Sequence, residues 1–464
     1  MIRLLNAHFP ARTLFLGVSE ACLVGLAFVA ATIARLGAND ASIVLNYEQG
    51  LLKILVVSAA FVTCMYYFDL YDSTILSNRR EVVTRLIQVL GAMCFLLGVV
   101  YYVYPSVGLG RGIFLIGLLL VALLLFLSRR LFLTLNTLSQ FAERALILGE
   151  GELAESLVSE LQLRNELGVR VVGHIKSFEG RSEGLNLAPN GGEFDEILQS
   201  IVLYRPDRII VAMEDRRGKL PVEDLLKLKS RGVAIEDGAE VYEAVLGKIP
   251  IQSLRLSWLL FSPGFRVARP LLTYKRICSI LFSAFALILT LPLMILISLV
   301  IRADSEGPAI FQQKRIGKDG KVFTLFKFRT MVDGADQHAN HRPAARTDSR
   351  FTRVGRVLRR TRLDELPQLF NILRGDMYFV GPRPFVPDQE DEFIQKIPHY
   401  RHRWVVKPGA TGWAQVNRGY NVTVEDNADK LAYDLFYIKN ISIGLDLLIL
   451  FKTAKILLLG RGSQ

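Results

Sequence analysis

The stretch KRICSILFSAFALILTLPLMILISLVIR, residues 275–302, decides the fold. An almost unbroken apolar run from Ile277 to Val300 has cations at both ends, and Pro292 interrupts it two-thirds of the way along. As a straight helix this run would measure about 36 Å, long enough to cross a bilayer. A crossing would carry the basic remainder of the chain out of the cytoplasm, against the positive-inside rule. We therefore expect a re-entrant helix over 275–302 that bends at Pro292, with a kinked crossing helix as the alternative.

Four more apolar segments fill the first 135 residues, at roughly 13–35, 50–68, 86–104 and 112–128. Each is close to the roughly 20 residues that a membrane helix needs, so residues 1–135 are expected to form a four-helix transmembrane bundle. Cations gather in alternate connections: Arg3 and Arg12, then Arg79, Arg80 and Arg85, then Arg129 and Arg130. By the positive-inside rule, both ends of this bundle face the cytoplasm. Glu20, inside the first segment, is either a functional residue or the partner in an interhelical hydrogen bond.

The bulk composition is typical of a membrane protein that handles anions. Hydrophobic residues make up 51% of the 464 residues, and the formal net charge is +12. Such a chain suits membrane lipids with anionic head groups or phosphorylated substrates, and its long apolar runs argue against nucleic acid. The four cysteines lie in apolar segments without a CxxC pair, so neither a zinc site nor a disulfide framework is expected. The pairs His338 with His341 and His399 with His402 are expected to be solvated or to face phosphate rather than to hold a metal.

Residues 140–262 alternate strand-like and helix-like stretches, which predicts a parallel, Rossmann-like sheet of the kind that binds nucleotides or CoA. The strand-like stretches lie in RALILGEGELAESLVSEL (144–161), VRVVGHI (169–175), DRIIVAM (207–213) and GVAIED (232–237). The turn Gly149-x-Gly151-x-x-Ala154 resembles a dinucleotide fingerprint. However, no acid follows the second strand to bind a ribose, and there is no YxxxK pair. A regulatory or scaffolding domain is therefore favoured over an oxidoreductase.

Two adjacent carboxylates, Asp364 and Glu365, stand in RTRLDELPQLFNILRGDMYFVGPRP (360–384) after a run of arginines. Arginine binds phosphate bidentately, while a carboxylate can hold a metal ion or attack phosphorus. We expect the segment to lie at the surface, so that these carboxylates keep an ordinary pKa and are ionised at pH 7. Carboxylates next to arginines in this way suit the binding and reaction of a diphosphate. Alternatively, Arg360 and Asp364 stand at the i,i+4 spacing of an ion pair on a helix.

Two stretches of the C-terminal part are amphipathic. FTRVGRVLRRTR (351–362) sets arginines at three-residue steps among apolar residues, which is typical of a helix in the plane of the membrane interface. LDLLILFKTAKILLLGRG (445–462) fits either a shallow membrane helix or a core helix. The expected fold class is therefore membrane α plus α/β: a four-helix bundle, a Rossmann-like domain, and an α-rich domain with a re-entrant helix and interfacial amphipathic helices.

Residues 270–464 resemble the bacterial sugar transferases, the monotopic polyprenyl-phosphate phosphoglycosyl transferases. The resemblance rests on the apolar segment and on three motifs that follow it: SEGPAIFQQKRIGKDGKVFTLFKFRTM (305–331), LRRTRLDELPQLFNILRGDMYFVGPRP (358–384) and KPGATGWAQVN (407–417). The three-part chain is similar to the long subgroup that starts exopolysaccharide, capsule or O-antigen synthesis. The family often has Ser-Pro at the membrane break, whereas this chain has Thr290-Leu291-Pro292. The Thr290 hydroxyl is then available to the carbonyls freed by the proline.

The resemblance implies transfer of a sugar phosphate from a UDP-sugar to undecaprenyl phosphate, with release of UMP, on the cytoplasmic face of the bacterial inner membrane. Asp364 matches the nucleophile that forms an acyl-phosphate, and Glu365 matches its neighbour at the Mg²⁺ site, where both carboxylates are candidate ligands. Phosphate-binding roles fall in the same way on Arg359, Arg383, Lys327 and Arg329. The chemistry agrees, because cations must neutralise a diphosphate before an anion can attack it.

Three other functions stay open at this point. One is a membrane-tethered nucleotide-sugar oxidoreductase that works through the Rossmann-like domain, and another is a non-catalytic scaffold of a polysaccharide assembly complex. A soluble-fold glycosyltransferase is disfavoured because the chain has no D-x-D motif. A homodimer is one candidate for the oligomeric state. The sugar is left open among glucose, galactose and N-acetylated sugars.

Overall fold

The structure is a computed structural model, and it describes residues 1–4, 6–76, 79–137, 142–164, 167–176, 203–213, 220, 222–253, 262, 264–265, 268–335, 348, 350–418 and 423–459. The chain forms two compact units, described separately below: Met1–Ile2 with Phe9–Val241, and Arg3–His8 with Tyr242–Gln464. Residues 242–253 therefore belong with the C-terminal part. The boundaries predicted at 135/140 and 262/270 stay predictions.

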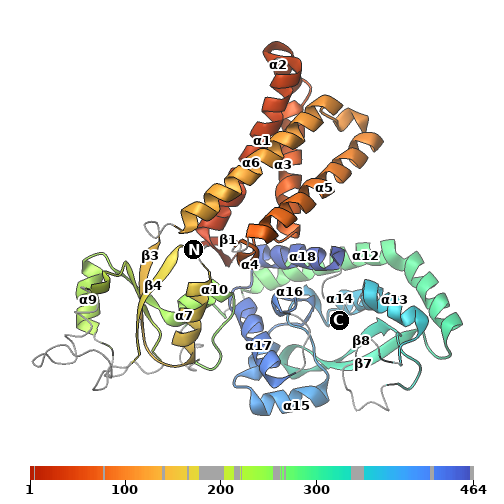
Figure 1. Cartoon of the computed structure of the whole chain (residues 1–464). Coiled ribbons are helices and arrows are strands. Elements are labelled where there is room, and N and C mark those ends of the chain that lie inside the picture. The colour runs from red at the N-terminus through yellow and green to blue at the C-terminus, as the bar shows by residue number, and fades with distance from the viewer. Residues whose placement is uncertain are drawn as a thin grey trace, which may run out of the picture. The chain divides into compact units, whose positions relative to one another are not determined.

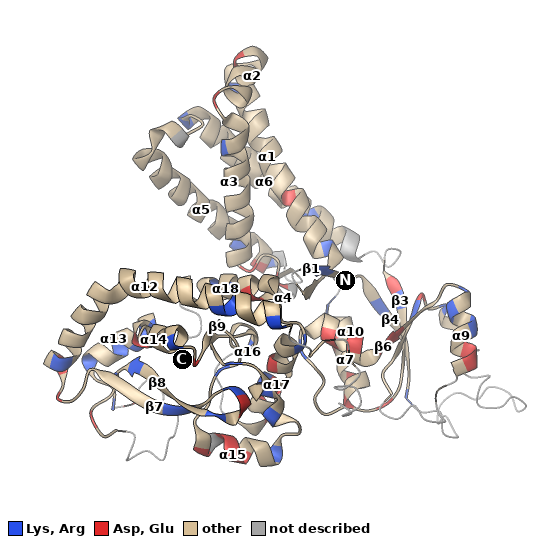
Figure 2. Cartoon of the chain, turned by 180° about the vertical axis from the view of Figure 1, so that it is seen from behind, with Lys and Arg blue, Asp and Glu red and all other residues tan. Residues whose placement is uncertain are grey.

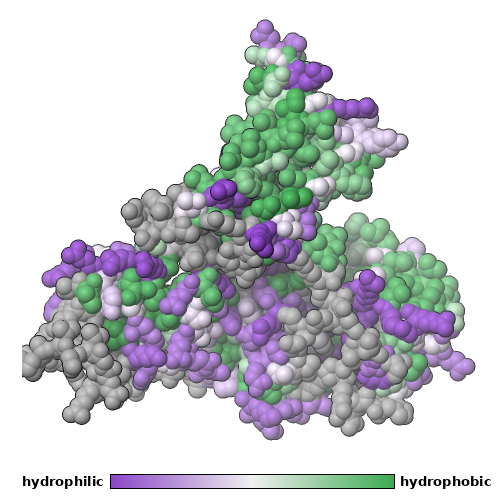
Figure 3. Space-filling view, in the orientation of Figure 1, coloured by the Kyte–Doolittle hydropathy of each residue, from purple (hydrophilic) through white to green (hydrophobic). Residues whose placement is uncertain are grey.

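The apolar N-terminal segments form long helices (Figure 1). The first elements of the chain are β1 (Ile2–Leu4), β2 (Ala7–Phe9), α1 (Ala11–Leu36), α2 (Ala38–Asn46), α3 (Gly50–Tyr67), α4 (Ser73–Leu76), α5 (Arg79–Val103), η1 (Pro105–Val107) and α6 (Arg111–Thr137). The helices α1, α3, α5 and α6 overlie the four predicted segments, and each is long and apolar enough to cross a membrane. They share a core that includes Phe28, Phe61 and Leu125, and Figure 3 shows their outer surface to be largely hydrophobic. An apolar exterior is what helices in lipid require.

A buried ion pair links two of these helices. Glu20 of α1 and Arg129 of α6 are almost fully buried, with Arg129 Nε 2.6 Å from Glu20 Oε1. The Tyr71 hydroxyl donates a further hydrogen bond of 2.8 Å to Glu20 Oε2. These contacts confirm the hydrogen-bond interpretation of Glu20. The prediction that Arg129 lies in a connection between helices was wrong. The helix α6 continues beyond the apolar run to Thr137, and Arg129 lies within it.

The parallel sheet is confirmed. Its region contains β3 (Glu143–Leu148), α7 (Glu152–Leu163), β4 (Val169–Ile175), β5 (Arg208–Val211), α9 (Val222–Ser230), β6 (Ala234–Asp237) and α10 (Gly238–Leu246). The strand order is β4-β3-β5-β6, and every pairing is parallel. At Gly149 the backbone has φ +135°, and a Cβ atom would lie 2.5 Å from the Ala212 carbonyl oxygen. Close packing against the end of β5 therefore requires this glycine, whether or not a nucleotide binds.

The C-terminal unit is built around one long helix and two small sheets. From residue 269 on, the elements are α12 (Arg269–Asp304), β7 (Ile310–Ile316), η4 (Lys318–Gly320), β8 (Val322–Phe328), α13 (Arg353–Thr361), η5 (Leu363–Glu365), α14 (Gln368–Arg374), β9 (Tyr378–Val380), α15 (Pro387–Lys396), η6 (Tyr400–Val405), β10 (Gly409–Thr411), α16 (Trp413–Asn417), α17 (Val424–Lys439) and α18 (Ile443–Leu458). The strands β7 and β8 form an antiparallel hairpin, while β9 and β10 pair in parallel. Figure 2 shows Lys and Arg along the hairpin.

The helix α12 is continuous for 36 residues and contains Pro292. Its axis changes direction along its length (Figure 2). A proline at position 292 deprives the Ile288 carbonyl of its usual donor. The Thr290 hydroxyl donates to the Ala286 carbonyl instead, at 2.7 Å. It therefore does not bond to the Ile288 carbonyl that the proline frees, as the sequence suggested, but to a carbonyl two residues earlier.

The second half of α12 packs on the rest of the C-terminal unit. Met294, Ile297 and Ile301 form a buried cluster with Phe328 of β8 and Leu358 of α13. The opposite face of α12 carries many exposed apolar side chains, among them Phe285, Ile288, Leu289 and Leu296. The helix α18 has a similar division, since Leu445 and Ile449 are buried while Leu447 and Leu458 are exposed. The core-helix interpretation is thus confirmed for the buried face of α18, and the shallow membrane helix stays a prediction for the exposed face.

Candidate active site

The helix that follows the two carboxylates, α14, is fixed by polar contacts at its middle and at its C-terminal end. Asn371 is fully buried; its side chain accepts from the Phe326 N–H at 3.0 Å and donates to the Thr324 carbonyl at 2.7 Å. Arg276 of α12 donates to two carbonyls in the last turn of α14, at 2.7 and 2.8 Å. Because the last carbonyls of a helix have no partner within it, Arg276 supplies what this end of α14 lacks. The helix is thus held to β8 and to α12.

A sharp turn places the carboxylates in front of α14. The helix α13 begins at its cap Thr352, whose hydroxyl accepts from the Gly355 N–H at 2.9 Å, and it ends at Thr361. Arg362 then adopts a left-handed conformation with φ 57°, and Asp364 and Glu365 follow in η5. Arg360 and Asp364 therefore do not share a helix, so the ion-paired helix interpretation was wrong.

Glu365 is surrounded by cations. Lys327 Nζ of β8 donates to its Oε1 atom at 3.0 Å, while Arg383 Nη2 and Arg362 Nη1 lie 3.9 Å from its carboxylate oxygens. Burial opposes ionisation of Glu365, but the charges of Lys327, Arg383 and Arg362 outweigh it and hold its pKa at about 2, below the ordinary 4.5. Glu365 is thus ionised at neutral pH, and its carboxylate holds the three cations close together.

Asp364 has a different environment. Its side chain is 8% exposed, and burial raises its pKa from the ordinary value, against the opposing charges of Lys327 and Arg359. The expectation of a surface carboxylate with ordinary pKa was therefore wrong. The physical reason is the left-handed turn at Arg362, after which Asp364 lies buried in η5. A carboxylate that has lost much of its hydration needs less desolvation before it attacks an electrophile.

The other predicted phosphate-binding residues lie in distinct places. Arg359 acts on Asp364 by its charge, and its guanidinium stacks on the Phe351 ring at 4.6 Å. Arg383 lies beside Glu365, as given above. Arg329 is buried and donates to the carbonyls of Ser305 and Glu306, at 2.7 and 2.6 Å. It therefore fastens the residues that follow α12, and a contact between Arg329 and phosphate stays a prediction.

The donor set fits a magnesium ion that is shared with a substrate. The described part of the chain holds no group of three or more His, Cys, Asp or Glu side chains that could enclose a metal. Magnesium commonly takes one or two protein carboxylates, completes its shell with water and substrate phosphate, and does not need a full protein cage. Asp364 and Glu365 match this pattern. His399 and His402 stack edge to face, with ring centroids 5.7 Å apart; His338 and His341 lie outside the described residues.

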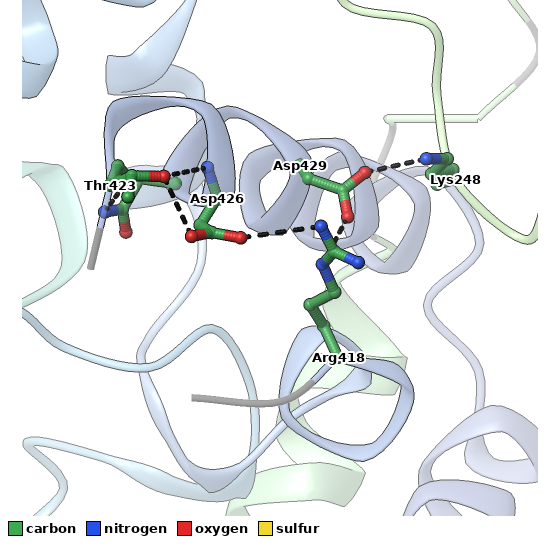
Figure 4. Close-up of polar contacts among 6 residues, drawn as sticks. Lys248, Arg418, Thr423, Asp426 and Asp429 are labelled. Atoms are coloured by element: carbon green, nitrogen blue, oxygen red, sulfur yellow. Dashed lines mark hydrogen bonds and ion pairs between the residues drawn. The ribbon is translucent and has the colours of Figure 1, made fainter. Parts of the chain in front are cut away.

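A second polar cluster, missed in the sequence, flanks the start of α17 (Figure 4). Arg418 bridges two carboxylates of this helix, 3.5 Å from Asp426 Oδ1 and 2.8 Å from Asp429 Oδ2. Lys248 approaches Asp429 from the other side, at 2.7 Å. These contacts tie the segment after α10 to α17. The sequence gives little indication of them, because Lys248 and Asp429 are distant along the chain.

Comparisons with known proteins agree with this geometry. The family described as "Bacterial sugar transferase" matches residues 271–460, which confirms the resemblance noted in the sequence. An undecaprenyl-phosphate galactose phosphotransferase of Salmonella typhimurium is 32% identical over 349 residues, 71% of this chain and 71% of the relative. A UDP-N-acetylgalactosamine-undecaprenyl-phosphate N-acetylgalactosaminephosphotransferase of Aeromonas hydrophila is 40% identical over 226 residues, 48% of this chain and 52% of the relative.

A third relative extends the match toward the N-terminus. An undecaprenyl-phosphate glucose phosphotransferase of Komagataeibacter xylinus is 34% identical over 334 residues, 68% of this chain and 59% of the relative. The matched parts of the Aeromonas and Komagataeibacter proteins are thus about half to three-fifths of their length. The names of the three relatives give three different sugars, so the comparisons leave the sugar open.

Proposed function

We propose, from the premise that this chain belongs to the bacterial sugar transferase family, that it transfers a sugar phosphate from a UDP-sugar to undecaprenyl phosphate. The products are UMP and undecaprenyl diphosphate sugar. The observation that carries the proposal is the pairing of a buried Asp364 with an ionised Glu365 that collects Lys327, Arg362 and Arg383. In an exopolysaccharide, capsule or O-antigen pathway this would be the first membrane step.

The reaction proceeds in two displacements at one phosphorus atom. An oxygen of Asp364 bonds to the phosphorus that bears the sugar, the bond from that phosphorus to the bridging oxygen breaks, and UMP leaves with the electron pair. An oxygen of undecaprenyl phosphate then bonds to the same phosphorus, and the Asp364 carboxylate leaves. Two inversions give retained configuration at phosphorus. No general base is needed, since both nucleophiles are anions.

The cations make attack of an anion on a diphosphate feasible. Lys327 and Arg383 are held beside Glu365 and can face the phosphate oxygens, where they oppose the growing charge. Bound Mg²⁺, held by Asp364 or Glu365, would supply further charge neutralisation of the diphosphate. The charges of Lys327 and Arg359 favour the ionised form of Asp364, against the burial that raises its pKa.

The anchoring of α12 supports a re-entrant path for this helix. Near its start, Arg276 bonds to α14. At its end, the Asp304 carboxylate accepts from the Val354 N–H of α13 at 3.1 Å. Both contacts are thus made to the same small catalytic fold, whereas a straight helix would separate Arg276 from Asp304 by about 42 Å. We infer that α12 enters and leaves the cytoplasmic face of the inner membrane, so that the site serves a cytosolic sugar donor and a lipid acceptor.

The enzymatic proposal is tested by Asp364→Asn in membranes or detergent, with undecaprenyl phosphate, Mg²⁺ and a panel of UDP-sugars. The wild type is expected to release UMP with at least one donor, and the variant to lose this release while keeping its melting temperature. Asp319→Asn is the matched control, because Asp319 is an exposed turn residue with φ 57°, a conformation that asparagine tolerates. Near-normal turnover by Asp364→Asn would remove Asp364 from the mechanism.

The path of α12 is tested by cysteine labelling in a cysteine-free background. Thr273→Cys and Ala303→Cys place thiols at exposed positions near the two ends of the helix. A membrane-impermeant maleimide should label both only in inside-out vesicles. Labelling of the two positions from opposite sides would show a crossing helix.

A further inference from the structure

One buried residue outside the proposed chemistry holds the loop that carries Arg383. Arg403 of η6 is 4% exposed, and its Nη2 atom donates to the Arg383 carbonyl oxygen at 3.2 Å. The same guanidinium stacks on the Phe385 ring, 4.6 Å from its centroid. Arg403 therefore contacts the loop on both sides of Pro384.

The surroundings of Arg403 fix its own position. Its Nη2 atom lies 2.7 Å from Asp434 Oδ2 of α17, and its Nη1 atom lies 3.9 Å from Glu390 Oε1 of α15. The Tyr400 hydroxyl is 2.5 Å from Nη1. A guanidinium withdrawn from water is costly even when paired, and well-packed apolar residues are often at least as stabilising. Stability alone thus gives little reason for an ionic cluster at this position. The contacts of Arg403 with the loop that carries Arg383 give a better one.

The remaining anchors of the loop lie elsewhere. Gly381 N–H donates to the Thr411 carbonyl at 2.9 Å, and Gly409 N–H donates to the Pro382 carbonyl at 3.0 Å, which ties the beginning of the loop to β10. The Pro384 carbonyl accepts from Arg315 at 3.1 Å, and the Phe385 carbonyl accepts from the Ile316 N–H of β7 at 3.0 Å. At residue 383 itself the backbone contact comes from Arg403. The direction in which the Arg383 side chain leaves the loop therefore depends on Arg403.

We propose that Arg403 is a positioning residue for Arg383, holding that guanidinium where it meets the diphosphate. This rests on the proposed function, in which Arg383 faces phosphate. Arg383 Nη2 lies 3.9 Å from Glu365 Oε1, so a small rotation of the loop would move its charge away from the reacting group. Misplacement of a catalytic group by about 1 Å can cost about a hundredfold in rate.

The test is Arg403→Lys, which keeps the charge and the attraction to Asp434. A lysine ammonium lacks the planar fork that reaches a carbonyl and a carboxylate while lying flat on a ring. We expect kcat/KM for the UDP-sugar to fall about a hundredfold with little change in melting temperature. Arg401→Lys is the matched control, because Arg401 is an exposed arginine of the same η6 segment. Unchanged kcat/KM in folded Arg403→Lys would overturn the proposal.

A double-mutant cycle separates positioning from a direct role. If Arg403 acts through Arg383, then Arg383→Ala with Arg403→Lys should be no slower than Arg383→Ala alone. Multiplied losses would show that Arg403 does not act through Arg383 and would refute the proposal.

Amide hydrogen exchange of Arg383, Phe385 and Val386 gives a readout that needs no activity, including for a variant that is less stable. Faster exchange in Arg403→Lys and not in Arg401→Lys supports the anchor, and equal exchange contradicts it. If the wild type releases no UMP from any donor while exchange still rises in Arg403→Lys, the proposed function fails and the anchor stands.

Discussion

Replacement of Lys327 by methionine should weaken the protein in a way that depends on pH. Methionine has a side chain of similar length but no charge, so the substitution removes the ammonium 3.0 Å from Glu365 Oε1 and keeps most of the volume. The two side chains are 19% and 22% exposed. Such a pair is screened less than one on the open surface, where a typical ion pair is worth at most about 1 kcal/mol.

The size of the effect follows from the pKa of Glu365. The drop from 4.5 to about 2 corresponds to roughly 3 kcal/mol in favour of the ionised, folded form, at about 1.4 kcal/mol for each pKa unit. Lys327 is the nearest of the three cations, and Arg362 and Arg383 lie 3.9 Å away. We therefore assign about half of the total, about 1–2 kcal/mol, to Lys327.

The sign of the pH dependence is fixed by the depressed pKa. A carboxyl group whose pKa is lower in the folded state contributes stability that is present above its unfolded value and is lost as the pH falls through its folded value. The Lys327→Met variant should thus melt several degrees below the wild type at pH 7, and the gap should shrink between about pH 4.5 and pH 2.

Thermal unfolding in detergent, followed by tryptophan fluorescence at pH 7 and at pH 3, measures this gap. Lys321→Met is the control, because Lys321 is an exposed lysine at the other end of the same hairpin. A gap for Lys327→Met that is the same at both pH values would refute the electrostatic reasoning and leave only a packing effect.

Three more outcomes are expected. Gly355→Ala should destabilise the protein by several kcal/mol in melting experiments, because its Cβ would lie 2.0 Å from the Thr330 carbonyl oxygen; a normal melting temperature would contradict the close approach. Arg276→Met should cost about 1–3 kcal/mol, because it leaves two carbonyls of α14 without donors, and equal stability would mean that water replaces them. Removal of divalent metal by EDTA should stop UMP release and added Mg²⁺ should restore it, whereas full activity in EDTA would exclude Mg²⁺ from the reaction.

Features that repeat along the sequence were the predictable ones. Short apolar runs between helical stretches predict the strands of the parallel sheet. Long apolar segments with few charged residues predict the helices α1, α3, α5 and α6. These signals are local, since each depends on neighbours within one turn or one strand. Adjacent acids also occur elsewhere in the chain, for example at Glu223-Asp224 and Glu236-Asp237, so the Asp364-Glu365 pair was recognised by the arginines around it and by the family motif that contains it.

The depth of Asp364 was not predictable in the same way. Its burial depends on Arg362 taking a left-handed conformation, φ 57°, which is uncommon for arginine and has no glycine or asparagine to signal it. The Arg403 cluster was missed for another reason. Its members come from α15, η6 and α17, and buried polar residues leave no periodic pattern along the chain.

The cations at the start of α12 show where a reasonable sequence rule misleads. Charges that flank an apolar run are usually taken as lipid-facing anchors. In the structure, Lys275 is 7% exposed and lies 2.7 Å from Asp446 Oδ2 of α18, while the neighbouring Arg276 bonds to α14. These two residues thus fasten the membrane helix to the catalytic fold. At the other end of α12, the Asp304 carboxylate accepts from the Val354 N–H of α13. Contacts at Arg276 and Asp304 therefore hold α12 to the two helices, α14 and α13, on either side of the turn that carries Asp364 and Glu365.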